Sequence, residues 1–123
     1  MLISPSVLNS NLGRLSEEIS KVEGVADLIH LDVMDNHFVP NLSFGLPVVA
    51  GVIAQTSLPV DVHLMIDDPD RWAPAYGEAG AYSVTFHIEA AKDPLTLSKD
   101  ISATGARVAA ALKPGTDLDS LDG

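Results

Sequence analysis

The sequence predicts an α/β fold in which parallel strands alternate with helices. Short apolar runs typical of buried strands take turns with segments whose apolar residues recur at helical spacing. The two patterns repeat about every 25 to 30 residues, the length of one strand–helix unit. The composition, 46% hydrophobic and 20% charged, is typical of a chain with a packed core. Because strands that alternate with helices pair through right-handed crossovers, we expect a parallel sheet.

The first strand and the first helix are each bounded by turn-forming residues. Residues 1–4 form an apolar run that Pro5 stops, so a strand is expected there. A helix is expected over residues 12–22, because four apolar residues recur there at helical spacing. Asn9 or Asn11 would provide its N-cap, and Gly24 would end it.

The remaining elements follow from the same signals. Further strands are expected at residues 27–33, 59–65, 82–88 and 107–112. Helices are expected at residues 46–55 and 70–79, and a further one begins at Asp93–Pro94 and ends at Gly105. Thr116 or Asp117 could cap another helix, which gives a total of about five strands and four complete helices.

Two parallel architectures compete for this pattern. An open doubly wound sheet often carries a glycine-rich turn after its first strand, but residues 5–9 contain no glycine. A (β/α)₈ barrel of the TIM type collects polar residues at the carboxyl ends of its strands, where this chain has His30, Asp32, His63, His87 and Glu89. The barrel is therefore favoured. A whole barrel needs ~250 residues, so residues 1–123 are expected to form one partial barrel.

Charge and composition exclude several classes of function. The formal net charge of −10 argues against a nucleic-acid-binding surface. No basic region followed by an apolar core opens the chain, and no apolar run approaches the ~20 residues of a membrane span, so neither a signal peptide nor a membrane partner is expected. The absence of cysteine is consistent with a cytoplasmic location.

Polar residues interrupt two of the expected strands at alternate positions. His30, Asp32 and Met34 fall two apart and so project from one strand face. Asp61, His63 and Met65 repeat this pattern. Buried imidazoles and carboxylates need a compensating partner, which could be a metal ion or a hydrogen-bond network, and spacing alone leaves both open.

The other polar pair and the two methionines also allow two interpretations. His87 and Glu89 could support a metal site through hydrogen bonds or could make purely structural ones. On spacing alone, Met34 and Met65 would be interpreted as core residues.

Taken in order along the chain, these segments resemble the ribulose-phosphate 3-epimerases, metal-dependent (β/α)₈ enzymes of the pentose phosphate pathway. The resemblance covers essentially all 123 residues and rests on Ser4–Leu8, His30–Asp35, His37–Asn41 through Phe44–Gly45, Asp61–Met65, Thr85–Ala90 and Leu112–Thr116. It identifies residues 1–123 as the N-terminal part of a ribulose-phosphate-binding barrel whose C-terminal half is absent. Asn36 stands where many relatives have glycine.

The resemblance implies a role for each site residue. Ser6 and His63 would contact the sugar; His30, Asp32 and His63 would bind the metal; Asp32 would also be the catalytic base; Met34 and Met65 would line the reaction centre. The metal would be Zn²⁺, Fe²⁺, Mn²⁺ or Co²⁺. The family's second catalytic aspartate, which is also a metal ligand, is on the seventh strand, and its phosphate-binding loops follow strands six to eight. All of these lie outside residues 1–123.

The expected function is metal-dependent epimerisation at C3 of D-ribulose 5-phosphate to D-xylulose 5-phosphate. Removal of a proton next to the C2 carbonyl would give an ene-diolate. A sister epimerase acting on another sugar phosphate, or a catalytically silent half-barrel that binds metal or another subunit, are the alternatives. Because a half-barrel exposes two strand edges and its inner face, self-association is also expected.

Overall fold

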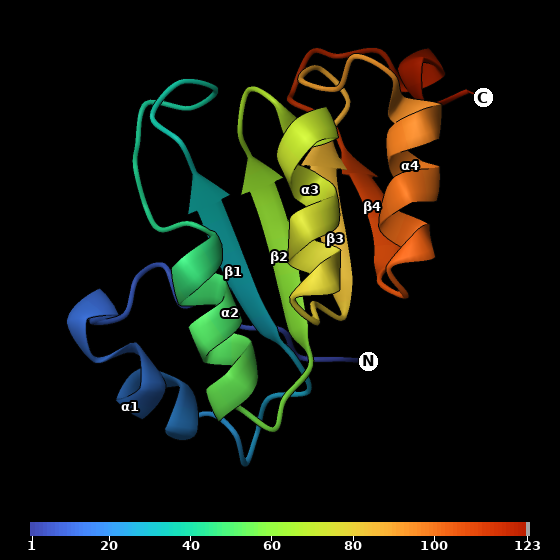
Figure 1. Ribbon diagram of the computed structural model, residues 1–123. Helices are drawn as coiled ribbons and strands as arrows, with labels where there is room; N and C mark the ends of the chain where they lie inside the picture. Colours follow the sequence, from blue (N-terminus) through green and yellow to red (C-terminus); the bar gives the residue numbers. More distant parts are fainter. Residues whose placement is uncertain (123) are drawn as a thin grey trace.

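A single parallel sheet organises the chain. The computed structural model describes residues 1–122, and Figure 1 shows its four strands in the order β1-β2-β3-β4. The strands are β1 (Ile29–Met34), β2 (Val60–Met65), β3 (Ser83–His87) and β4 (Arg107–Ala111). Each neighbouring pair is parallel, so all four carboxyl ends lie at the same edge of the sheet. The α/β prediction of a partial barrel is confirmed at this level.

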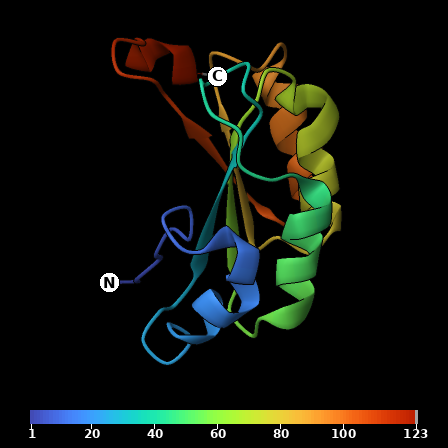
Figure 2. The ribbon, with the colours of Figure 1, turned by 90° about the vertical axis from the view of Figure 1, so that its left-hand side faces the viewer.

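The helices cover one face of the sheet only, as Figure 2 shows in side view. They are the α-helices α1 (Leu15–Ser20), α2 (Leu46–Gln55), α3 (Pro69–Glu78) and α4 (Pro94–Ala103). Two short 3₁₀ helices, η1 (Leu12–Arg14) and η2 (Leu118–Leu121), lie nearer the two ends of the chain, and η2 follows the end of β4. Proline occupies the first turn of α2, α3 and α4, where its missing N–H has no helical partner to lose. None of the helices among residues 1–122 is both long and apolar enough to cross a membrane.

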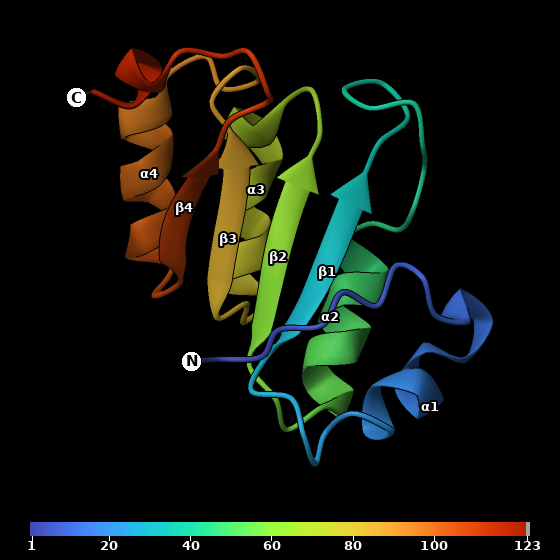
Figure 3. The same cartoon turned by 180° about the vertical axis from the view of Figure 1, so that it is seen from behind.

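Strand residues alternate between a buried face and a polar one. The side chains that face the helices form the core and are at most 3% exposed in β1, β2 and β3: Ile29, Leu31, Val33, Val60, Val62, Leu64, Val84 and Phe86. Each of them stabilises the fold by roughly 1.5–3 kcal/mol through burial. The opposite face carries the half-buried polar residues of the three strands and is free of helices, as the view from behind shows (Figure 3). The fold therefore fixes which residues can form a site.

The predicted first strand is the main correction. Residues 1–4 are exposed and form no strand, so the sheet has four strands instead of about five. The segment still runs beside β1: the Ile3 carbonyl accepts from Leu28 N–H at 3.1 Å, and an isolated bridge joins Ser6 to His30. Pro5 explains the interruption, because it has no N–H to donate to a ladder.

The other elements lie close to their predicted positions. The helix expected at residues 46–55 has the bounds of α2, and the later strands differ by a residue or two at their ends. The first helix is shorter than expected: η1 begins after Asn11, whose side chain accepts from Gly13 N–H at 3.1 Å, and α1 ends at Ser20. Asp117 caps η2, where another helix was expected.

Candidate metal centre

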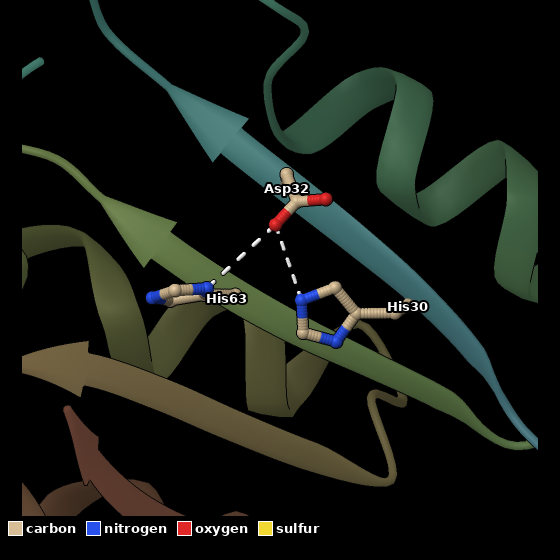
Figure 4. A group of neighbouring side chains, drawn as sticks. All are labelled: His30, Asp32 and His63. Carbon is tan, nitrogen blue, oxygen red and sulfur yellow. Dashed lines mark hydrogen bonds and ion pairs between the residues drawn. The ribbon is translucent and has the colours of Figure 1, made fainter. Parts of the chain in front are cut away.

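Three side chains meet on the helix-free face of β1 and β2. Strand register sets Asp32 beside His63, and His30 lies two residues before Asp32 on the same strand (Figure 4). Asp32 Oδ1 is 3.1 Å from His30 Nε2 and 3.6 Å from His63 Nδ1. One ligand atom from each residue lies within 4.8 Å of the other two. The alternation of the strands and their register therefore place two imidazole nitrogens and a carboxylate oxygen around one point.

These three atoms fit a divalent metal ion of the first transition series. Imidazole nitrogen and carboxylate oxygen are ligands that such ions accept readily, whereas Mg²⁺ and Ca²⁺ prefer oxygen alone. The three residues are half-buried, with 13% to 24% of each side chain exposed, so the site has an open side. Three protein ligands with an open position is the arrangement of catalytic rather than structural zinc sites.

The charges of the site are strongly coupled. The Asp32 carboxylate raises the pKa of His30 to about 9, with a further contribution from Asp61 that outweighs burial. Burial alone would raise the pKa of Asp32, but hydrogen bonds from His30, His63 and the Ser6 hydroxyl lower it well below its usual range. Asp32 is therefore held as a carboxylate, the form that can bind a cation or accept a proton.

A second row of polar groups extends from His63. His63 Nε2 is 2.8 Å from His87 Nε2, and His87 Nδ1 is 3.4 Å from Glu89 Oε2. Burial lowers the pKa of His87, which favours a neutral ring that can accept a hydrogen bond. Glu89 also accepts from Thr116 Oγ1 at 2.8 Å and from the backbone N–H of Lys113. The predicted pair of His87 and Glu89 thus lies next to the candidate ligand His63, as a supporting role requires.

The remaining predicted site residues lie around this cluster. The Ser6 hydroxyl donates to Asp32 Oδ2, which brings the N-terminal segment to the site. Met34 and Met65 are register partners at the carboxyl ends of β1 and β2, one alternation beyond Asp32 and His63. Met34 is 7% exposed. His30 was expected at the carboxyl end of its strand, but it is the second residue of β1, and Ser6 is bridged to it there.

Several residues near the site were not predicted. Asp61 Oδ2 lies 2.8 Å from His30 Nδ1, and Ser83 Oγ donates a hydrogen bond to Asp61 Oδ1 at 2.5 Å. The strand alternation already placed Asp61 on this face, so the same signal could have added it to the site. Lys113 could not be found in this way: its Nζ lies 3.8 Å from the centre of the Phe38 ring, and Phe38 is 75 residues earlier in the chain.

Asp35 fixes the loop that follows β1. Its Oδ1 accepts from the backbone N–H of His37 and of Phe38, each at 2.9 Å, and its Oδ2 accepts from Asp67 N–H at 2.8 Å. Asn36 sits between them with φ 61°, a left-handed conformation that asparagine tolerates better than most residues. The loop is thereby attached to the loop after β2, and the Phe38 ring centre lies 5.1 Å from that of His87.

The sequence matches known proteins over almost its whole length. Residues 2–123 match a family model described as the ribulose-phosphate 3 epimerase family. Proteins named ribulose-phosphate 3-epimerase are 56% identical in Mycobacterium tuberculosis, over 96% of this chain, and 53% identical in Mycobacterium leprae. The one from Bacillus subtilis is 41% identical over 98% of this chain. The chain spans about half the length of these relatives, 51%, 52% and 56% respectively.

Proposed function

Because the chain belongs to the ribulose-phosphate 3 epimerase family, we propose that it supplies the metal-binding half of an enzyme that interconverts D-ribulose 5-phosphate and D-xylulose 5-phosphate. The observation that carries the proposal is the convergence of His30, Asp32 and His63 within 4.8 Å on one sheet face. The names of the relatives refer to a ribulose phosphate and to epimerisation at position 3, and the family resemblance adds the position of the phosphate and the product.

His30 Nε2, Asp32 Oδ1 and His63 Nδ1 would hold the metal, because these atoms already face one another. A bound Zn²⁺, Fe²⁺, Mn²⁺ or Co²⁺ would act as a Lewis acid toward the oxygens on C2 and C3 of the sugar. His87 would accept a hydrogen bond from His63 Nε2–H, which leaves Nδ1 of His63 free as a ligand. Glu89 lies 3.4 Å from His87 Nδ1, near enough to attract a proton on that nitrogen, although the two make no hydrogen bond.

Asp32 would be the catalytic base on one face of the sugar. Its carboxylate removes the proton from C3, and the electron pair moves toward the C2 oxygen to give an ene-diolate. Return of a proton to the opposite face of C3 inverts the centre. The family resemblance assigns that second step to an aspartate of the seventh strand, which lies beyond these residues. Ser6 and His63 would contact the sugar, and Met34 and Met65 would keep water from the carbanion.

A catalytically silent half-barrel is the alternative for the chain by itself. The 122 described residues provide four strands, and the resemblance puts the second catalytic aspartate on a seventh. We therefore expect negligible epimerase activity from the purified chain of 123 residues. A robust rate from such a preparation, free of host enzyme, would contradict the assignment of the second acid.

Calorimetric titration with Zn²⁺ tests the metal site directly. His63→Ala should weaken binding at least ~10-fold, the order found when support of a metal site is lost. His37→Ala is the matched control, because His37 is exposed in the loop and lies outside the cluster. Equal affinities of the two variants and the native chain would remove the basis of the proposed site.

A chimeric barrel tests the activity. Residues 1–123 joined to the C-terminal half of the 56%-identical mycobacterial relative should convert D-ribulose 5-phosphate. Asp32→Asn should lower kcat by about 10²–10⁴-fold, the usual contribution of a general base. Asp100→Asn, at an exposed position of α4, should leave kcat unchanged. An active Asp32→Asn chimera would show that another group is the base.

Three expectations stay predictions from the sequence. They are a cytoplasmic location, the absence of nucleic-acid and membrane partners, and a single barrel domain that extends over residues 1–123. The sugar phosphate as a small-molecule substrate is part of the proposal, since the relatives' names refer to it.

A further inference from the structure

The ring nitrogen of His30 that points away from the cluster has a partner of its own. His30 Nε2 faces Asp32, and His30 Nδ1 lies 2.8 Å from Asp61 Oδ2. A neutral imidazole carries one proton, on either nitrogen, and only the unprotonated nitrogen can bind a metal. The group that faces Nδ1 therefore influences which nitrogen carries the proton, and so whether Nε2 can bind a metal.

Asp61 is held in place from its other side. Strand register aligns His30 of β1, Asp61 of β2 and Ser83 of β3 in one row across the sheet. Ser83 Oγ donates to Asp61 Oδ1 at 2.5 Å, which leaves Oδ2 for His30. The Asp61 side chain is 23% exposed, so its carboxylate is partly shielded from water. A hydrogen bond to His30 Nδ1–H offsets that loss of hydration.

We propose that Asp61, oriented by Ser83, is a positioning residue that keeps a proton on Nδ1 of His30 and so presents Nε2 as the metal ligand. The inference rests on the metal site of the proposed function. A carboxylate can only accept hydrogen bonds, so Asp61 favours the Nδ1–H form of the ring. The Asp32 carboxylate, 3.1 Å from Nε2, favours the other form, and Asp61, at the shorter distance of 2.8 Å from Nδ1, opposes it. Asp61 makes no contact with the position that the three ligand atoms surround; it acts through His30 alone.

Asp61→Asn separates this role from a merely structural one. The asparagine has the same shape, and its Oδ1 can still accept from Ser83, but its amide NH₂ would then face His30 Nδ1. An amide donor favours the opposite tautomer, with the proton on Nε2, as in the corresponding substitution of a catalytic triad. The fold would be preserved and the ligand nitrogen blocked.

Calorimetry with Zn²⁺ on the complete 123-residue chain gives the first readout. Asp61→Asn should bind Zn²⁺ about 10- to 100-fold more weakly than the native chain, the range for loss of a partner behind a metal-bound histidine. Ser83→Ala should weaken binding in the same direction by less, because it only loosens Asp61. Asp67→Asn, an exposed carboxylate outside the row, should bind as the native chain does.

Nitrogen-15 NMR of the imidazole rings gives the second readout and needs no metal. In a buffer alkaline enough to keep the imidazole rings neutral, the Asp61→Asn ring should carry more of its proton on Nε2 than the native ring does. The backbone amide spectrum checks that each variant is folded, and Ser83→Ala replaces Asp61→Asn if the latter is not. Native-like Zn²⁺ affinity with an unchanged tautomer would overturn the inference. A native chain that shows the Nδ1–H ring but binds no Zn²⁺ would instead overturn the proposed function.

Discussion

Gly77 of α3 lies against Thr104, the residue that follows α4, and we expect Gly77→Ala to destabilise the fold. A Cβ atom at this buried glycine would lie 2.1 Å from Thr104 Oγ1 and 2.9 Å from Thr104 Cβ. Rotation about χ1 can move the hydroxyl, but it cannot move Cβ, so the backbones must separate. Overpacking of this kind costs typically ~1–3 kcal/mol.

The helical preference of alanine offsets only part of this cost. Glycine is about 1 kcal/mol worse than alanine inside a helix, and less near an end, and Gly77 is the second-last residue of α3. The net loss should therefore be about 1–2 kcal/mol. With a urea m-value of about 2 kcal/mol/M, in the middle of the usual range, the unfolding midpoint should fall by roughly 0.5–1 M. Circular dichroism across a urea series measures this shift.

Gly51→Ala is the matched control, because Gly51 is also helical and its added Cβ would have no heavy atom within 4 Å. This variant should be as stable as the native chain or up to about 1 kcal/mol more stable. Thr104→Gly should reduce the cost of Gly77→Ala in a double-mutant cycle, since it removes the three atoms nearest to the new Cβ. A Gly77→Ala chain as stable as its Gly51→Ala counterpart would refute the steric argument.

Three further predictions concern charge and loop structure. Burial would raise the pKa of Glu89, but hydrogen bonds from Lys113 and Thr116 outweigh it and lower this pKa from 4.5 to about 2. The stabilising contribution of the Glu89 carboxylate should therefore be complete above about pH 4.5 and be lost as the pH falls toward 2. The difference in urea midpoint between the native chain and Glu89→Gln should become smaller from pH 7 to pH 3, and a constant difference would contradict this. The free edge of β4 and the uncovered sheet face should promote self-association, and the net charge of −10 should oppose it at low salt. Sedimentation should therefore detect larger species as salt is added. A monomer at every salt and protein concentration would contradict this prediction. Asp35→Ala should speed hydrogen exchange at the amides of His37, Phe38 and Asp67, which lose their acceptor, and unchanged protection would show that the loop is held by other contacts.

Residue patterns within one element predicted the features that depend on that element alone, such as the bounds of a helix and the face on which a strand residue lies. The apolar periodicity and Pro47 fixed α2 to the residue, and strand alternation placed His30, Asp32 and His63 on one face. The apolar residues 1–4 alone wrongly predicted a first strand, because strand formation also depends on a ladder with β1, of which only an isolated bridge at Ser6 and single backbone hydrogen bonds form. The contact of Lys113 with Phe38 joins distant loops, and only the assembled sheet brings them together.

All three candidate ligands belong to one strand–helix–strand unit, from β1 through α2 to β2. During synthesis this unit leaves the ribosome before β3 and β4 have been made, since chains emerge from the N-terminus. Free energy of metal binding is also free energy of folding when the site is absent from the unfolded chain. An ion bound at this stage would therefore stabilise the β1–α2–β2 unit and leave β2 as a preformed edge strand with which β3 can pair.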